Sequence, residues 1–389
     1  MTNENIVKME PMLQLINSNF VALAIEEVQE NHFLYKLLDD IIDKMRVQNA
    51  LFNKLFQKKF FGGSFWDRLK VGRPDEYDVH VQCKLHNFKC KLVPSDQPGW
   101  VNLKFEKQSN PHKKKNRRNQ KPYYGIPGFH VLVNKDGYLD TEKVMLWFHQ
   151  TLARVLKGKR SNRKRVCSIT IGQQQFKMSV RRHGPAFTFA INTDSETNNL
   201  VHVDFVPAFL FEGWQFPDFG FRANPTTKEE TFIVAKPVKG DIGTRYWQLS
   251  FQNQERELLA DRGNLKPALR LLKKMRDKFN HYCIASFYLK NLILWELETR
   301  PEGFWEQPLS VVFIEVLQSY KNALENNSLP FYWYNGKKYN LFDSLSANQT
   351  KMISTKIGEV IIAMKKSPSD KKLAKFFLTR REYALFRSW

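Results

Sequence analysis

The stretch 76–85, EYDVHVQCKL, decides the fold that we predict for this chain of 389 residues. Polar and apolar residues alternate along it, which is typical of a β-strand in a sheet. Side chains two apart on a strand share a face, so Glu76 and Asp78 lie on one face and Val79 and Val81 on the other. By itself the Glu-x-Asp pair is a weak signal, because any solvated strand can carry one.

Two further features strengthen this signal. Gly-Gly-Ser at 62–64 ends twelve residues before Glu76, and a tight turn there can present N–H groups and a hydroxyl to phosphate oxygens. Asp204 interrupts the apolar stretch 200–211, LVHVDFVPAFLF, where a carboxylate is costly if it is buried without a partner. The alternative is that Asp204 is a core residue bonded to backbone, and that Glu76 and Asp78 are surface acids.

Phosphoryl transfer gives all three acids a common purpose. Two metal ions bridge the attacking and leaving oxygens of an in-line displacement, and Mg²⁺ prefers hard carboxylate and phosphate oxygens. We therefore expect Glu76, Asp78 and Asp204 to hold two Mg²⁺ or Mn²⁺ ions. Asp204 would also lie near the attacking ribose hydroxyl.

The rest of the chain divides into a mixed part and a helical part. One long amphipathic helix is predicted from about 24 to 60, and another at 141–156. Further strands are predicted at 166–171, 176–182, 187–191 and 200–211, which suggests an α/β lobe. After about residue 253 the apolar residues recur with helical spacing. The helical stretches there are 269–279, 285–298, 311–325 and 355–366.

The formal charge of +22 indicates a polyanionic partner, either nucleic acid or an anionic membrane. Residues 104–182 carry most of it, with 20 Lys or Arg against four acids. The run at 113–118 reads equally well as a ligand contact, a nuclear-localisation signal or a solvated loop. The run at 157–165 lies between a predicted helix and a predicted strand, which favours phosphate contact. Its basic residues are Lys157, Lys159, Arg160, Arg163, Lys164 and Arg165.

Neither a signal peptide nor a membrane-spanning stretch is evident, so a cytoplasmic protein is expected, with the nucleus also open. The four cysteines are scattered without a Cys-x-x-Cys pair, which favours a reducing compartment. No cysteine-rich zinc site is expected.

Gly63-Ser64, the Glu76-x-Asp78 pair and the distant Asp204 together resemble the cyclic GMP–AMP synthase and cyclic GMP–AMP synthase-like receptor family of nucleotidyltransferases. RPDEYDV, GPAFTFAI and YWQLSFQNQERELL resemble further motifs of that family. The similarity runs from the long helix to about residue 298, and the last ninety residues are similar only in helical character.

The resemblance implies an α/β (α+β) bilobal nucleotidyltransferase fold. A mixed-sheet catalytic lobe and a helical lobe would be joined by a long spine helix, with an N-terminal segment at 1–22, the spine and catalytic lobe at 23–252 and the helical lobe at 253–389. Nucleic acid would reorganise the loop after Ser64, and the site would make a cyclic dinucleotide from ATP and GTP. The implied nucleotide contacts are Gly63, Ser64, Gln248, Ser250, Lys273, Ser286, Phe287 and Lys290.

Three departures from the family pattern bear on ligand and substrate. The zinc-ribbon insertion is replaced by LADRGNLKPA, so no zinc is expected, and double-stranded RNA becomes the preferred trigger, as in the insect-type receptors. Gln248 stands where the family has Arg, so base selection differs. Phe287 replaces a stacking Tyr, and it keeps the stacking surface but loses the hydroxyl.

The resemblance also allows a homo-oligomer induced by ligand, and no membrane partner is expected. Three alternatives stay open: an oligoadenylate-synthase-like enzyme with linear products, a catalytically silent nucleotide-binding protein, and a plain basic protein that binds nucleic acid or membrane. All three acids and Ser64 are present, which argues against the silent protein.

Overall fold

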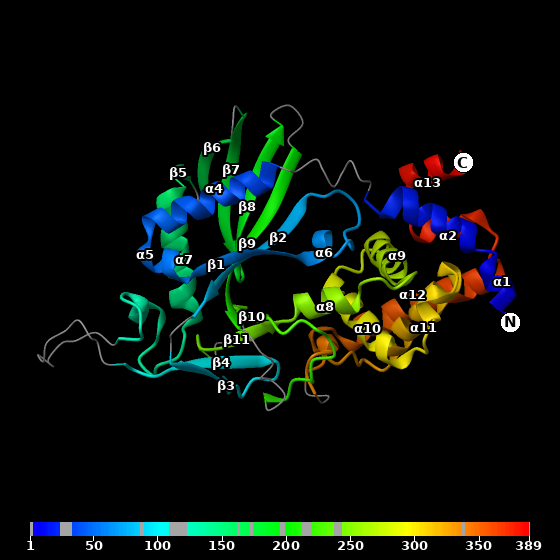
Figure 1. Ribbon diagram of the computed structural model, residues 1–389. Helices are drawn as coiled ribbons and strands as arrows, with labels where there is room; N and C mark the ends of the chain where they lie inside the picture. The colour runs from blue at the N-terminus through cyan, green and yellow to red at the C-terminus, as the bar shows by residue number, and fades with distance from the viewer. Residues whose placement is uncertain are drawn as a thin grey trace, which may run out of the picture. The chain divides into compact units, whose positions relative to one another are not determined.

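The computed structural model describes residues 3–23, 33–85, 89–108, 123–156, 158–161, 164–171, 174–194, 199–211, 219–236, 243–335 and 339–388 (Figure 1). The chain forms two compact units. The sheet unit comprises Val28–Gly63 and Pro74–Asn253, and the helical unit comprises Met1–Glu27, Ser64–Arg73 and Gln254–Trp389. The chain therefore passes from one unit to the other between Gly63 and Ser64.

Over the described ranges, the sheet unit is built on an eleven-stranded mixed sheet, in the order β3-β4-β11-β10-β9-β8-β7-β6-β5, with β2 paired to β9 and β1 paired to β2. Its strands are β1 (Phe56–Gly62), β2 (Glu76–Lys84), β3 (Cys90–Pro94), β4 (Trp100–Phe105), β5 (Gly158–Ser161), β6 (Lys164–Ile171), β7 (Gln174–His183), β8 (Ala186–Asp194), β9 (Asn199–Phe211), β10 (Thr231–Val234) and β11 (Trp247–Ser250). The β2–β9 pair is parallel, and the other named pairs are antiparallel. The predicted fold class is confirmed.

All five strands predicted from the sequence form, as β2, β6, β7, β8 and β9. The longest of them, β9, carries a continuous apolar second half and is buried between β2 on one edge and β8 and β10 on the other. Shorter strands such as β10, with four buried residues, are too brief to show a period in the sequence.

The prediction of one helix from 24 to 60 is wrong. Residues 24–32 lie outside the described ranges, and the described helix α4 spans Phe33–Gln48. Asn49 then takes an extended conformation and caps α5 (Ala50–Leu55), its side chain accepting a hydrogen bond from the Phe52 amide. An Asn at a helix N-cap satisfies an otherwise unpaired N–H, so it favours the break. The last residues of the predicted helix belong to β1, because they pair with β2.

Helices α4 and α7 (Thr141–Val155) pack together and cover part of the sheet (Figure 1). Phe148 of α7 stacks on Phe187 and packs against Phe205, with ring centroids 5.6 Å apart in both cases. These rings are buried, so the strands next to the acidic residues rest on an aromatic core.

The helical unit contains α1 (Asn3–Val7), α2 (Glu10–Ile16), the π-helix η1 (Asn17–Val21), α8 (Gln252–Leu258), α9 (Leu265–Lys278), α10 (Ser286–Thr299), α11 (Leu309–Glu325), α12 (Ala347–Lys366) and α13 (Arg380–Arg387), the first residues of α8 belonging to the sheet unit. All four helical stretches predicted after residue 253 are confirmed, as α9 to α12. Among the described residues, no helix is long and apolar enough to cross a membrane.

Candidate active site

Asp78 and Asp204 are register partners on the parallel strands β2 and β9. Neighbouring strands lie about 4.8 Å apart and register partners share a face, so the pairing puts two carboxylates side by side. Glu76 lies two residues before Asp78 on the same face of β2, opposite His202. Both aspartates are half-buried, and Glu76 is exposed.

Thr188 of β8 holds Asp204 from the other side. It is the register partner of Asp204, and its hydroxyl donates a hydrogen bond of 2.5 Å to Asp204 Oδ1. A carboxylate held this way costs less to bury and keeps its orientation. The role of Thr188 was not predicted, although the residue lies in the GPAFTFAI motif.

The glycine turn approaches Asp78 at Gly63. The φ angle of Gly63 is +77°, in the left-handed region that favours glycine. A Cβ built on it would lie 1.7 Å from Asp78 Oδ2. Both the backbone angle and the carboxylate therefore require glycine here, and the contact of Gly63 with a nucleotide stays a prediction.

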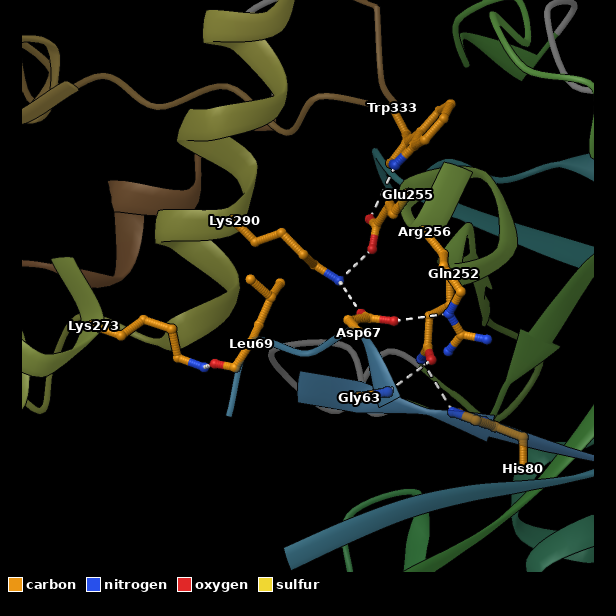
Figure 2. A network of polar contacts seen from close by, with 10 residues as sticks. All are labelled: Gly63, Asp67, Leu69, His80, Gln252, Glu255, Arg256, Lys273, Lys290 and Trp333. Atoms are coloured by element: carbon orange, nitrogen blue, oxygen red, sulfur yellow. Dashed lines mark hydrogen bonds and ion pairs between the residues drawn. The ribbon is translucent and has the colours of Figure 1, made fainter. Parts of the chain in front are cut away.

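Gln252 joins the turn to the strand that carries Asp78 (Figure 2). Its Oε1 accepts a hydrogen bond from the Gly63 amide at 3.2 Å, and its Nε2 lies 3.1 Å from His80 Nε2. Because Oε1 is the acceptor toward Gly63, the amide nitrogen is the donor toward His80. The role of Gln252 was not predicted either, although the residue lies within the YWQLSFQNQERELL motif.

His80 is a packing residue of this site. It is buried between Phe60 and Phe232, at centroid distances of 6.0 and 4.8 Å. Burial lowers the pKa of His80 to about 3, because the charged imidazolium would lose its hydration. The neutral ring accepts the Gln252 hydrogen bond and orients Gln252.

The donor set suits a hard divalent cation. Carboxylate oxygens are the ligands that Mg²⁺ takes in proteins, and the pairing of Asp78 with Asp204 brings two of them to one face. Within the described ranges, no three His, Cys, Asp or Glu side chains are gathered closely enough to hold an ion. The three-acid metal site therefore stays a prediction.

Gln248 and Ser250 lie on β11, opposite Val234 and Phe232 of β10. Val234 in turn pairs with Ala208, four residues after Asp204 on β9. Side chains an even number apart share a face, so the register puts Gln248 and Ser250 on the face that carries Asp204. Gln248 is buried and Ser250 half-buried.

In the helical unit, two predicted nucleotide contacts already have protein partners (Figure 2). Lys273 donates a hydrogen bond of 2.5 Å to the carbonyl oxygen of Leu69. Lys290 pairs with Glu255, and its Nζ lies 4.0 Å from Asp67 Oδ2. Burial and neighbouring cations lower the pKa of Lys273 to about 8.

Ser286 and Phe287 open helix α10. The Ser286 hydroxyl accepts a hydrogen bond of 2.6 Å from Arg276. The Phe287 ring packs against Phe331 at a centroid distance of 5.8 Å. Their contact with a nucleotide stays a prediction.

The basic run at 157–165 falls on a hairpin. Strands β5 and β6 pair with Arg160 opposite Arg165, and with Lys159 and Lys164 at neighbouring register positions. Lys157 and Arg163 lie outside the described residues, as does the other run at 113–118. The hairpin backbone therefore presents four of the six predicted basic positions together.

A mixed sheet with paired aspartates beside a glycine turn fits a nucleotidyltransferase, and the comparison with known families assigns the chain to this class. Residues 65–261 match the Mab-21 protein nucleotidyltransferase domain, and residues 264–359 match the Mab-21 protein HhH/H2TH-like domain. The chain belongs to the cyclic GMP–AMP synthase-like receptor family, as its sequence motifs predicted.

Two relatives carry this assignment. A cyclic GMP-AMP synthase-like receptor of Aethina tumida is 37% identical over 96% of this chain and 92% of its own length. One of Tribolium castaneum is 34% identical over 97% of this chain and 94% of its own length. A third, from Microplitis demolitor, is 26% identical over 98% of this chain and 70% of its own length.

Proposed function

We propose that this nucleotidyltransferase binds double-stranded RNA and then joins ATP and GTP into a cyclic GMP–AMP-type second messenger, in the cytoplasm and in antiviral defence. The observation that carries the chemical part is the in-register pair Asp78 and Asp204, with Gly63 against Asp78. The names of the relatives from Aethina tumida and Tribolium castaneum support the product class.

Each part of the sheet site has a distinct role in this reaction. Glu76, Asp78 and Asp204 would hold two Mg²⁺ or Mn²⁺ ions, which supply charge stabilisation for the triphosphate. Asp204, oriented by Thr188, would orient the attacking ribose hydroxyl. Gly63 and Ser64 would bind phosphate oxygens, and Gln248 and Ser250 would contact a base or ribose on the same sheet face.

The RNA-binding part rests on a basic surface of the sheet unit. A hollow of about 480 Å³ is lined by α4, the end of α7 and β6, where Asp40 pairs with Lys44, and its basic residues are Lys44 and Arg154. Both side chains are exposed, and β6 continues from this hollow into the basic β5–β6 hairpin. Duplex RNA is recognised mainly by shape and by backbone contacts, for which such a surface is suited.

Product analysis tests the proposal. Purified protein is incubated with ATP, GTP and Mg²⁺, alone and with duplex RNA or duplex DNA, and the products are separated and identified by mass spectrometry. We expect a cyclic dinucleotide only with duplex RNA. Linear oligonucleotides would indicate the oligoadenylate-synthase-like alternative, a DNA-only response would overturn the RNA assignment, and no product despite nucleotide binding would indicate a silent protein.

The RNA surface has its own test. Reversing the charge at Lys159, Arg160, Lys164 and Arg165 should weaken RNA binding and flatten its salt dependence, because each lost phosphate contact removes released counterions. The Lys351→Glu and Lys356→Glu exchanges on α12 serve as a control on the helical unit. Unchanged RNA affinity in the hairpin variant would move the RNA-binding surface elsewhere.

A further inference from the structure

Asp67 is a buried carboxylate in the short segment that follows the glycine turn (Figure 2). Arg256 Nε donates a hydrogen bond of 3.0 Å to Asp67 Oδ1. The ammonium of Lys290 lies 4.0 Å from Asp67 Oδ2. A buried charge is tolerated only when it is paired and hydrogen-bonded, so these two cations account for a carboxylate at this position.

The backbone just after Asp67 is also held by hydrogen bonds from side chains of the helical unit. Arg270 donates a hydrogen bond of 3.0 Å to the carbonyl oxygen of Arg68, and Lys273 donates to that of Leu69. Arg68 has a φ of +58°, a left-handed conformation that residues with a Cβ rarely adopt. Such a conformation persists only where the surroundings impose it.

Residues 67–69, which these contacts hold, close a turn that begins at Ser64. The Leu69 amide donates a hydrogen bond of 2.7 Å to the Ser64 carbonyl oxygen, and the Arg68 amide donates one of 3.0 Å to that of Phe65. Fixing Asp67 and Leu69 therefore fixes Ser64. Ser64 itself directly follows Gly63 in the chain.

Lys290 is in turn oriented by a second buried carboxylate. Glu255 pairs with Lys290 and accepts a hydrogen bond of 3.1 Å from the indole nitrogen of Trp333. Glu255 and Arg256 are neighbours on α8. The ammonium thus lies between two carboxylates, and a cluster of two acids and two bases has no net charge.

We infer that Asp67 is a positioning residue for the phosphate-binding turn at Gly63 and Ser64, and that Lys290 acts through Asp67 rather than on the nucleotide. The inference rests on the proposed function, in which Ser64 binds phosphate. Donors that are held in place before substrate arrives lose little freedom on binding. The ion pairs of Asp67 supply that order for the turn.

The rival possibility is that Lys290 is a phosphate ligand which Glu255 and Asp67 together withhold, so that removing the Asp67 charge would partly release it. The two possibilities predict opposite signs for Asp67→Asn. Loss of a positioning residue weakens nucleotide binding, whereas release of a withheld lysine strengthens it. Nucleotide affinity therefore separates them without any assumption about the product.

The experiment measures the affinity for a non-hydrolysable ATP analogue with Mg²⁺, together with kcat, KM and Tm, in Asp67→Asn, Lys290→Met and the double variant. Glu325→Gln is the matched control, because its carboxylate pairs with Lys321 on the surface of α11 and such pairs contribute little. Asp67→Glu tests rescue by a retained carboxylate.

We expect about tenfold weaker analogue binding and a kcat lowered by about 10-fold to 100-fold in Asp67→Asn, because small misplacements of binding groups have effects of this size. Lys290→Met should weaken binding less, since Arg256 still pairs with Asp67, and the double variant should be no worse than Asp67→Asn. Asp67→Glu should recover part of the affinity, and Glu325→Gln should match the wild type.

Tighter analogue binding in Asp67→Asn, or effects of the two single variants that simply add, would overturn the inference. If Asp67→Asn does not fold, Lys290→Met carries the test, and analogue affinity equal to or above that of the wild type overturns it. A wild-type protein that binds the analogue but forms no product would count against the proposed function alone.

Discussion

The two units fix their functional side chains by different means. In the sheet unit, strand register places Asp78 beside Asp204, and backbone pairing leaves little freedom. In the helical unit, long charged side chains from separate helices donate hydrogen bonds to the segment after Ser64. Register is encoded locally in strand periodicity, whereas the ionic contacts depend on how distant helices pack. Changes in the sheet site should therefore act on kcat alone, whereas changes in the ionic cluster should weaken nucleotide binding as well as lower kcat.

The largest effect is expected from Gly63→Ala. The new Cβ would meet the Asp78 carboxylate, and the φ of +77° is unfavourable for alanine. We expect kcat to fall by at least about 100-fold, measured as product formed with RNA, ATP and GTP. Gly72→Ala is the control, because Gly72 has a φ of +82° and a Cβ added to it would meet nothing within 4 Å. An equal loss of activity in the two variants would show that backbone strain, and not contact with Asp78, decides the outcome, and wild-type activity of Gly63→Ala would contradict the prediction.

A smaller effect is expected from Thr188→Val, which keeps the shape and removes the hydroxyl that donates to Asp204. Asp204 would then lose one hydrogen bond to a charged group, worth about 1.5–3 kcal/mol. We expect kcat to fall by about tenfold while RNA affinity is unchanged, and Thr188→Ser to restore most of the activity. A valine variant with wild-type kcat would contradict the role given to Thr188.

The smallest effect is expected on the pH dependence of the free energy of unfolding, through Lys273 of the helical unit. The pKa of Lys273 is lowered from 10.5 to about 8, so between these values the folded protein binds fewer protons than the unfolded chain. The free energy of unfolding should therefore rise with pH from about 8 to 10.5. Lys273→Met should flatten that rise in urea unfolding at pH values of about 7.5, 8.5 and 9.5, which bracket the lowered pKa. The same slope in both proteins would mean that Lys273 is not the group that titrates.

The sheet unit was largely predictable from the sequence. Alternation identified β2, and a charged residue in an apolar strand identified Asp204 as one that needs a partner. The sequence did not reveal β1, because 56–62, FQKKFFG, has no helix breaker before Gly62 and becomes a strand through its pairing with β2. Here tertiary pairing overrides local propensity.

For the helical unit, the sequence predicted the helices but not the contacts between their side chains. Family resemblance pointed to Lys273 and Lys290 as nucleotide contacts, whereas the structure pairs them with Leu69 and with Glu255 near Asp67. These partners come from segments about 200 residues and 35 residues away in sequence. No local pattern in the sequence carries such contacts.

The most direct test of the paired aspartates compares the wild type with Asp204→Asn. Both proteins are given duplex RNA, ATP, GTP and Mg²⁺, with product measured by mass spectrometry and RNA affinity measured in parallel. We expect a cyclic dinucleotide from the wild type, none from Asp204→Asn, and the same RNA affinity for both. Product formed by Asp204→Asn at the wild-type rate would contradict the claim that the paired aspartates of β2 and β9 carry the chemistry.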